Sequence, residues 1–184
     1  MLRHLPNLIS ILRILLVPPV AWLILRGYFG EALLLFVVAG VSDGLDGFLA
    51  KHFGWTSRLG SILDPLADKL LLTVSFLTLA WLGYLPLWLA ALIVLRDLII
   101  VIGGVLYHNL VGHFSLQPTI VSKFNTVLQI VVIALVLVNL AWLDIPNMVI
   151  DIAIYLLVLT VFASGADYIW TWGRRAMQSR RSGP

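Results

Sequence analysis

Four aspartates gather in one short part of a chain that otherwise has few acids. Asp43 and Asp46 form one pair and Asp64 and Asp68 a second, and together they are four of the nine acidic residues. Long apolar runs flank both pairs, and an ionised carboxylate is costly in such surroundings unless another group compensates its charge. The pattern therefore indicates a functional site in preference to a set of solvated loop acids.

The spacing within each pair fits the surface of an α-helix. Residues three or four positions apart lie on the same side of a helix, so each pair presents its carboxylates together. A short connector between two antiparallel helices brings the two faces close. Four carboxylates at such a place repel one another unless a cation neutralises them. Because oxygen ligands suit hard divalent ions, the sequence predicts a site for Mg²⁺ or Mn²⁺.

Small residues and one basic residue accompany the acids. Gly47, Ala50 and Gly60 allow a ligand or a neighbouring helix to approach the backbone closely. Lys51 adds a positive charge beside the same face. Plain helix packing would explain each small residue alone, but the set is more typical of a pocket for a nucleotide diphosphate.

The composition is that of a membrane protein. Of the 184 residues 61% are hydrophobic and 11% are charged, against about 25% charged in soluble domains. Since a span needs about 20 apolar residues, we predict an all-α integral membrane protein with six transmembrane helices. The expected spans cover about residues 8–25, 31–50, 60–82, 87–107, 122–142 and 147–172. They form one domain over residues 1–173, followed by a basic tail over residues 174–184.

The sequence lacks two features, cysteine residues and a signal-peptide cleavage site. The chain has no cysteine, so any metal must be held by oxygen or imidazole ligands. No small-residue cleavage site follows the first apolar run, and we therefore expect that run to be retained as a span.

The distribution of Lys and Arg predicts the orientation. Basic residues outside the spans concentrate on one side of the six-span arrangement, and Arg26 alone lies on the other. Those on the common side are Arg3, Lys51, Arg58, Lys123, Arg174, Arg175, Arg180 and Arg181. We expect both termini and the acidic site to face the cytoplasm, in a bacterial inner membrane. The basic tail is interpreted as a topology signal that also attracts anionic lipids.

The motif as a whole resembles that of a known family. Asp43-x2-Asp46-Gly47-x2-Ala50-(basic)-x8-Gly60-x3-Asp64-x3-Asp68 is similar to the signature of the CDP-alcohol phosphotransferases, also called CDP-alcohol phosphatidyltransferases. These integral membrane enzymes join a CDP-activated lipid to an alcohol and release CMP. Lys51 departs from the pattern, because the family usually has arginine there. Lysine keeps the charge but lacks the bidentate fork that arginine offers to phosphate.

The resemblance implies roles for individual residues. Two divalent ions, Mg²⁺ or Mn²⁺, would be held by Asp43, Asp46, Asp64 and Asp68. Asp68 would also act as the general base. CDP-diacylglycerol would be bound by Gly47, Ala50, Lys51 and Gly60. A homodimer is implied as well, and nucleic acid is not expected as a partner.

Shorter stretches predict the acceptor alcohol. Residues 60–69 are similar to the phosphatidylglycerophosphate synthases and the CMP-forming cardiolipin synthases, whereas Arg96-Asp97 and residues 118–129 are most similar to the cardiolipin synthases. Phosphatidylglycerol is therefore the expected acceptor, with glycerol 3-phosphate as the alternative. The candidate acceptor-binding residues are Arg58, Arg96 and Lys123. Arg96, like Arg13 in the first span, is equally consistent with a buried ion pair between helices.

Two other functions fit parts of the pattern. Intramembrane prenyltransferases also use paired acidic clusters and Mg²⁺, but their chains are longer than this one and their two clusters lie far apart in the sequence. A divalent-cation transporter would carry acids along several spans, whereas here they cluster at one face. Mg²⁺-dependent CMP release from CDP-diacylglycerol would support the phosphotransferase, and metal uptake without CMP would support the transporter.

Overall fold

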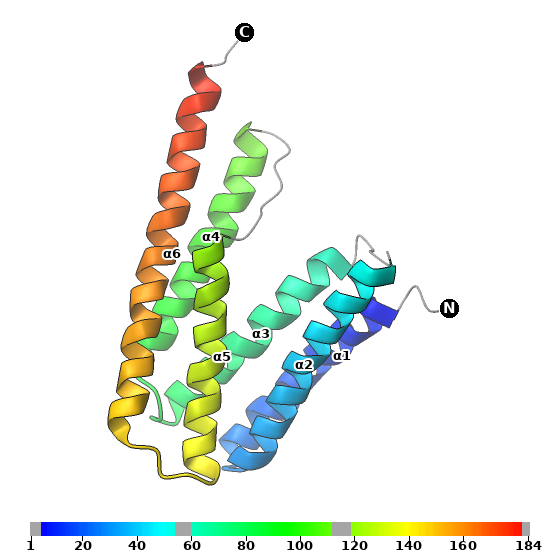
Figure 1. Ribbon diagram of the computed structural model, residues 1–184, viewed down its shortest axis with the longest axis vertical. Coiled ribbons are helices and arrows are strands. Elements are labelled where there is room, and N and C mark those ends of the chain that lie inside the picture. Colours follow the sequence, from blue (N-terminus) through cyan, green and yellow to red (C-terminus); the bar gives the residue numbers. More distant parts are fainter. Residues whose placement is uncertain (1–4, 54–59, 112–118, 182–184) are drawn as a thin grey trace. The chain divides into compact units, whose positions relative to one another are not determined.

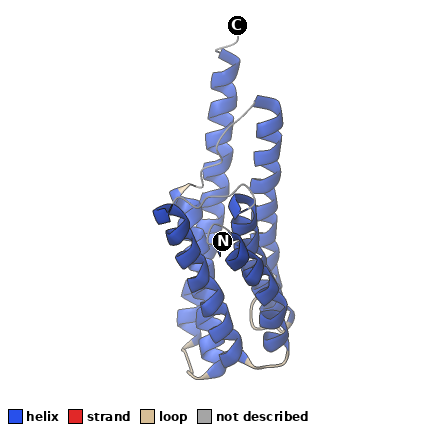
Figure 2. Ribbon diagram, turned by 90° about the vertical axis from the view of Figure 1, so that its right-hand side faces the viewer, coloured by secondary structure: helices blue, strands red, loops and turns tan. Residues whose placement is uncertain are grey.

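The computed structural model describes the backbone of residues 5–53, 60–111 and 119–181. Side chains are described for residues 9–42, 66–103 and 119–168. Helices account for nearly all of this part of the chain, and it contains no strand. Figure 2 shows these helices and the short loops between them.

All six predicted spans are confirmed as helices (Figure 1). Their bounds are α1 (Leu5–Leu25), α2 (Phe29–Phe53), α3 (Gly60–Trp81), α4 (Leu87–Val111), α5 (Ile120–Ala141) and α6 (Asn147–Arg181). The prediction ended the second, fourth and sixth helices too early, because apolar runs set its limits. The second and sixth helices continue beyond their apolar runs into polar residues such as lysine and arginine, which are good helix formers.

The chain divides into two compact units. Unit 1 comprises Met1–Leu87 and Ile133–Ile145, and unit 2 comprises Trp88–Val132 and Pro146–Pro184. This division does not follow the predicted boundary at residue 173, which stays a prediction.

Unit 1 is built on α1, α2 and α3. α1 packs against both of the other helices, and α2 also contacts α3, as Figure 1 shows for these neighbouring ribbons. Its core is made of buried apolar side chains from all three helices, including Val20, Ile24, Phe36, Phe76 and Leu79. α1 is assigned as one helix although Pro18 and Pro19 lie within it.

Glycines shape the turns and one close contact in unit 1. Gly27 follows α1 with a φ of 80°, and Gly83 follows α3 with a φ of 82°. Residues with a Cβ rarely adopt these angles, so glycine suits both turns. Gly30 packs against Trp142, and a Cβ at residue 30 would lie 2.9 Å from the ring atom Cζ2.

Unit 2 contains most of α4, the first part of α5 and all of α6. Buried apolar residues of α4 and α6, such as Leu89, Ile93, Leu157 and Val161, contribute to its core. Thr119 caps the start of α5, because its Oγ1 accepts a hydrogen bond from the backbone N–H of Ser122 at 3.2 Å.

Large apolar side chains cover much of the surface. Exposed examples on three helices are Leu34, Val38, Leu95, Leu98 and Leu159. Within the described residues, Ile120–Ala141 and Asn147–Tyr168 are long and apolar enough to cross a membrane. Exposed apolar surface of this extent is typical of a face that lipid covers.

Candidate active site

The aspartate motif lies on the connected ends of α2 and α3. Asp43 and Asp46 belong to the C-terminal part of α2, and Asp64 and Asp68 belong to the N-terminal part of α3. Residues 54–59 join these ends, and the two helices contact each other within unit 1. The pair of contacting helices that the sequence predicted is therefore confirmed.

Most side chains predicted for the site lie outside the described residues. These are Asp43, Asp46, Gly47, Ala50, Lys51, Gly60 and Asp64, together with Arg58 in the 54–59 segment. Except for Arg58, the backbone places them on α2 or α3, and their roles stay predictions. Asp68 is the one member of the predicted metal-binding set whose side chain is described.

Asp68 is held by an arginine from the neighbouring helix α1. Nη1 of Arg13 donates a hydrogen bond to Oδ1 of Asp68 over 2.5 Å. The Arg13 side chain is 0% exposed, whereas that of Asp68 is 38% exposed. A guanidinium removed from water needs a compensating charge close by, and Asp68 supplies it. The contact ties α1 to α3 at the acidic motif.

The residues of α2 and α3 fit a hard divalent cation. Carboxylate oxygens are the ligands that Mg²⁺ and Mn²⁺ prefer, and the helical positions within each aspartate pair place its members on one side. Residues 9–42, 66–103 and 119–168 contain no group of three or more potential metal ligands.

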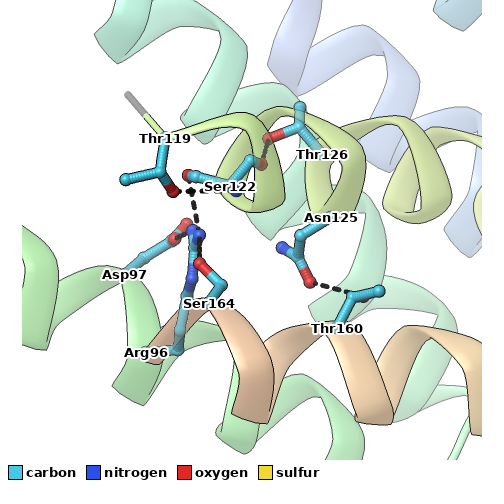
Figure 3. A network of polar contacts seen from close by, with 8 residues as sticks. All are labelled: Arg96, Asp97, Thr119, Ser122, Asn125, Thr126, Thr160 and Ser164. Atoms are coloured by element: carbon cyan, nitrogen blue, oxygen red, sulfur yellow. Dashed lines mark hydrogen bonds and ion pairs between the residues drawn. The ribbon is translucent and has the colours of Figure 1, made fainter. Parts of the chain in front are cut away.

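Arg96 forms a second polar centre, in unit 2 (Figure 3). Its Nη1 donates to Oδ1 of Asp97 at 2.7 Å, and its Nη2 donates to the hydroxyl oxygens of Ser122 at 2.8 Å and of Ser164. The Arg96 side chain is 6% exposed. One buried guanidinium thus links α4, α5 and α6. This arrangement stabilises the unit, and it leaves acceptor binding by Arg96 as a prediction.

The same face of α5 continues with two buried amides. The Oδ1 of Asn125 accepts a hydrogen bond from the Thr160 hydroxyl at 3.1 Å. In this part of the structure, Asn125 Nδ2, Gln129 Nε2 and Arg96 Nε are buried without a hydrogen-bond partner. Lys123, by contrast, is exposed at the start of α5. Arg96 and Lys123, both predicted to bind the acceptor, therefore differ in their surroundings. Arg96 is buried and bonded to other side chains, whereas Lys123 is exposed.

The partners in these contacts could not be read from the sequence. The sequence indicates that Arg13 could belong to a buried ion pair, and the structure shows that its partner is Asp68. Ser122 and Ser164 were not assigned to Arg96. A charge within an apolar run is a sign that a partner exists, but only the packing of the helices shows which residue it is.

The fold and the motif together agree with a known family. The model of the CDP-alcohol phosphatidyltransferase family matches residues 3–166, and the chain belongs to that family. The matched region contains every residue that the sequence analysis nominated for the site. Its family and its apolar helices make the chain a membrane protein.

Individual relatives carry two kinds of name. The chain is similar to the CMP-forming cardiolipin synthases of Rattus norvegicus, at 35% identity over 196 residues, and Homo sapiens, at 34% identity over 195 residues. It is also similar to a probable phosphatidylglycerophosphate synthase of Mycobacterium tuberculosis, at 29% identity over 177 residues.

The coverage differs between these relatives. The rat and human alignments each include 94% of this chain but 62% of the relative, so the chain spans less than two thirds of their length. The mycobacterial alignment includes 91% of this chain and 81% of the relative.

Proposed function

We propose that this protein transfers the phosphatidyl group of CDP-diacylglycerol to a glycerol-type alcohol and releases CMP. The observation that carries the proposal is the family match over residues 3–166, which contains the complete aspartate motif. Contact between α2 and α3, the helices that bear the motif, supports it.

Substrate binding is assigned to the paired helix ends. Asp43, Asp46, Asp64 and Asp68 would hold two divalent ions, Mg²⁺ or Mn²⁺. When bound, the ions would compensate the charge of the diphosphate and of the oxygen atoms that attack and leave. The small residues Gly47, Ala50 and Gly60 would let the CDP group lie close to the backbone, and Lys51 would contribute positive charge.

Asp68 is proposed to remove the proton of the acceptor hydroxyl. The acceptor oxygen then bonds to the lipid-side phosphorus, and the bond from that phosphorus to the oxygen bridging the two phosphates breaks. CMP leaves with the bridging oxygen, and the proton stays on the Asp68 carboxylate until it passes to solvent. A side-chain exposure of 38% allows the carboxylate to meet a polar substrate.

Phosphatidylglycerol is the acceptor that we favour. Relatives named cardiolipin synthase align over 94% of this chain. The alternative is glycerol 3-phosphate, since other relatives are named for transfer to that acceptor. Exposed Lys123 is the best described candidate for contacting an acceptor phosphate. Arg58 and Arg96 complete the proposed set, although Arg96 would have to act while it is bonded to Asp97, Ser122 and Ser164.

The setting in the membrane is also a proposal. All six helices would cross the bilayer, with both termini and the aspartates on the cytoplasmic side of a bacterial inner membrane, because Lys and Arg concentrate there. The enzyme would work as a homodimer. Its basic tail would lie against anionic lipids.

The test is CMP release by the purified protein in detergent micelles or lipid nanodiscs. CMP that appears from CDP-diacylglycerol only with Mg²⁺ or Mn²⁺ and an alcohol supports the proposal. Supplying phosphatidylglycerol and glycerol 3-phosphate separately, and identifying the lipid product, assigns the acceptor. Metal uptake into proteoliposomes without any CMP would instead support a divalent-cation transporter.

A further inference from the structure

Arg13 is a charged residue within the apolar helix α1, and its side chain has no exposed surface. Its neighbours along α1 include Ile11 and Leu15, which are exposed on the apolar outside of the unit. Arg13 instead points inward, and its exposed fraction is 0%. A residue of this kind is retained at a cost in solvation, so its interaction with a partner is where a role should be sought.

The partner is the residue to which the proposed function assigns proton removal. Nη1 of Arg13 donates a hydrogen bond to Oδ1 of Asp68, and a hydrogen bond between two charged groups is stronger than one between neutral groups. Arg13 is anchored in α1 and Asp68 in α3, and these helices pack directly on each other. The position of the carboxylate is therefore fixed by two helices and does not depend on α3 alone.

We propose that Arg13 is a positioning residue for Asp68, which holds the carboxylate in the orientation from which it takes the proton of the acceptor alcohol. This inference rests on the proposed function. Arg13 acts through Asp68 and does not contact substrate, because its side chain is wholly buried while the carboxylate is partly exposed. A base that is misplaced by about 1 Å can lose about 100-fold in rate, so such an anchor has a measurable effect.

The first experiment compares Arg13→Gln and Arg13→Lys with the parent in the full-length protein. We expect Arg13→Gln to lower kcat for CMP release by about 100-fold and to leave KM for CDP-diacylglycerol unchanged. Arg13→Lys keeps a positive charge on a flexible stem and should recover part of the loss. A raised KM with normal kcat would overturn the proposal, because Arg13 would then contact the substrate.

The matched control is Arg26→Gln. Arg26 is an exposed arginine of the same unit, and its guanidinium carbon lies 5.7 Å from the centre of the Trp22 ring. Its replacement should leave kcat and KM as they are. Normal kcat in Arg13→Gln would also overturn the proposal. If Arg13→Gln does not fold, Arg13→Lys still tests the proposal. A lysine variant that keeps the full parental kcat, and loses as much kcat as the parent when Asp68→Asn is added, would show that the guanidinium is not needed and would overturn the proposal.

A second experiment separates positioning from a merely structural role. Arg13→Gln is introduced into an Asp68→Asn background, and residual CMP release is measured in single turnovers with enzyme in excess. Since no carboxylate remains to be oriented, adding Arg13→Gln should lower the single-turnover rate constant no further. An additional 100-fold fall, on the scale expected for the single variant, would show that Arg13 acts independently of Asp68. A parent protein that releases no CMP at all would refute the proposed function itself, which is a different result from any of these.

Discussion

Replacing Asp68 by asparagine removes a negative charge while nearly preserving the shape of the side chain. The amide oxygen can still accept a hydrogen bond from Arg13 Nη1, which lies 2.5 Å from Oδ1 in the parent protein. The variant loses the capacity to take a proton from the acceptor hydroxyl. It therefore separates the proposed chemistry from the packing of α1 against α3.

The expected loss of activity is large and the expected loss of stability is small. General-base catalysis contributes about 10²–10⁴ in rate, which corresponds to about 2.7–5.5 kcal/mol in activation free energy. Removing one partner of a fully buried pair costs about 3–5 kcal/mol. Asp68 is 38% exposed and the amide keeps one hydrogen bond. We therefore expect the free energy of unfolding to fall by about 1–2 kcal/mol, as for the exchange of a charged for a neutral hydrogen bond.

The assay measures CMP release at several CDP-diacylglycerol concentrations, together with direct binding of CDP-diacylglycerol. Asp68→Asn should bind the lipid and lose turnover. Glu31→Gln is the control, because Glu31 is an exposed acid at the first turn of α2 and lies outside the site. Full turnover by Asp68→Asn would remove the base assignment. Loss of lipid binding together with turnover would instead trace the defect to the role of Asp68 as a ligand of the divalent ions.

Further predictions concern the hydrogen-bonded cluster around Arg96, the exposed Lys123, the divalent ions and the packing of α2. Arg96→Met should lower the free energy of unfolding by about 3 kcal/mol, measured by thermal unfolding, because it removes the link between α4, α5 and α6. Lys123→Met should change the free energy of unfolding by less than about 0.5 kcal/mol and should raise KM for the acceptor, measured by acceptor titration. Treatment with EDTA should abolish CMP release and added Mg²⁺ should restore it, so release that survives chelation contradicts the metal assignment. Gly30→Ala should destabilise the protein by about 1–2 kcal/mol, since its Cβ would lie 2.9 Å from Trp142. Gly40→Ala, with nothing within 4 Å of its Cβ, should instead stabilise α2 by up to about 1 kcal/mol in the same unfolding assay.

Much of the fold could be predicted because apolar runs and glycine turns are local features. Six runs of suitable length gave six helices, and the turns at Gly27 and Gly83 fall between predicted spans. The end of α6 at Arg181 could not be predicted in this way. Hydropathy marks where lipid contact ends, whereas a helix continues as long as its backbone hydrogen bonds and residue propensities allow.

The sequence predicted which helices carry the aspartates, but it did not predict the contacts between helices. Spacing placed the aspartates on two connected helices, and the bounds of α2 and α3 agree with this. The pairing of Arg13 with Asp68 depends on how α1 packs against α3, which no local pattern specifies. The same holds for Arg96, whose serine partners come from two other helices.

The most direct test of the proposed chemistry counts both products of one reaction. Purified protein is given CDP-diacylglycerol, Mg²⁺ and phosphatidylglycerol, and CMP and lipid products are quantified in the same sample. The proposal predicts that CMP and cardiolipin form in equal amounts, and that neither forms without the metal. If glycerol 3-phosphate alone supports the reaction, the acceptor assignment is wrong but the chemistry stands. CMP formation without a matching lipid product, or no CMP with either acceptor, would contradict phosphatidyl transfer by this protein.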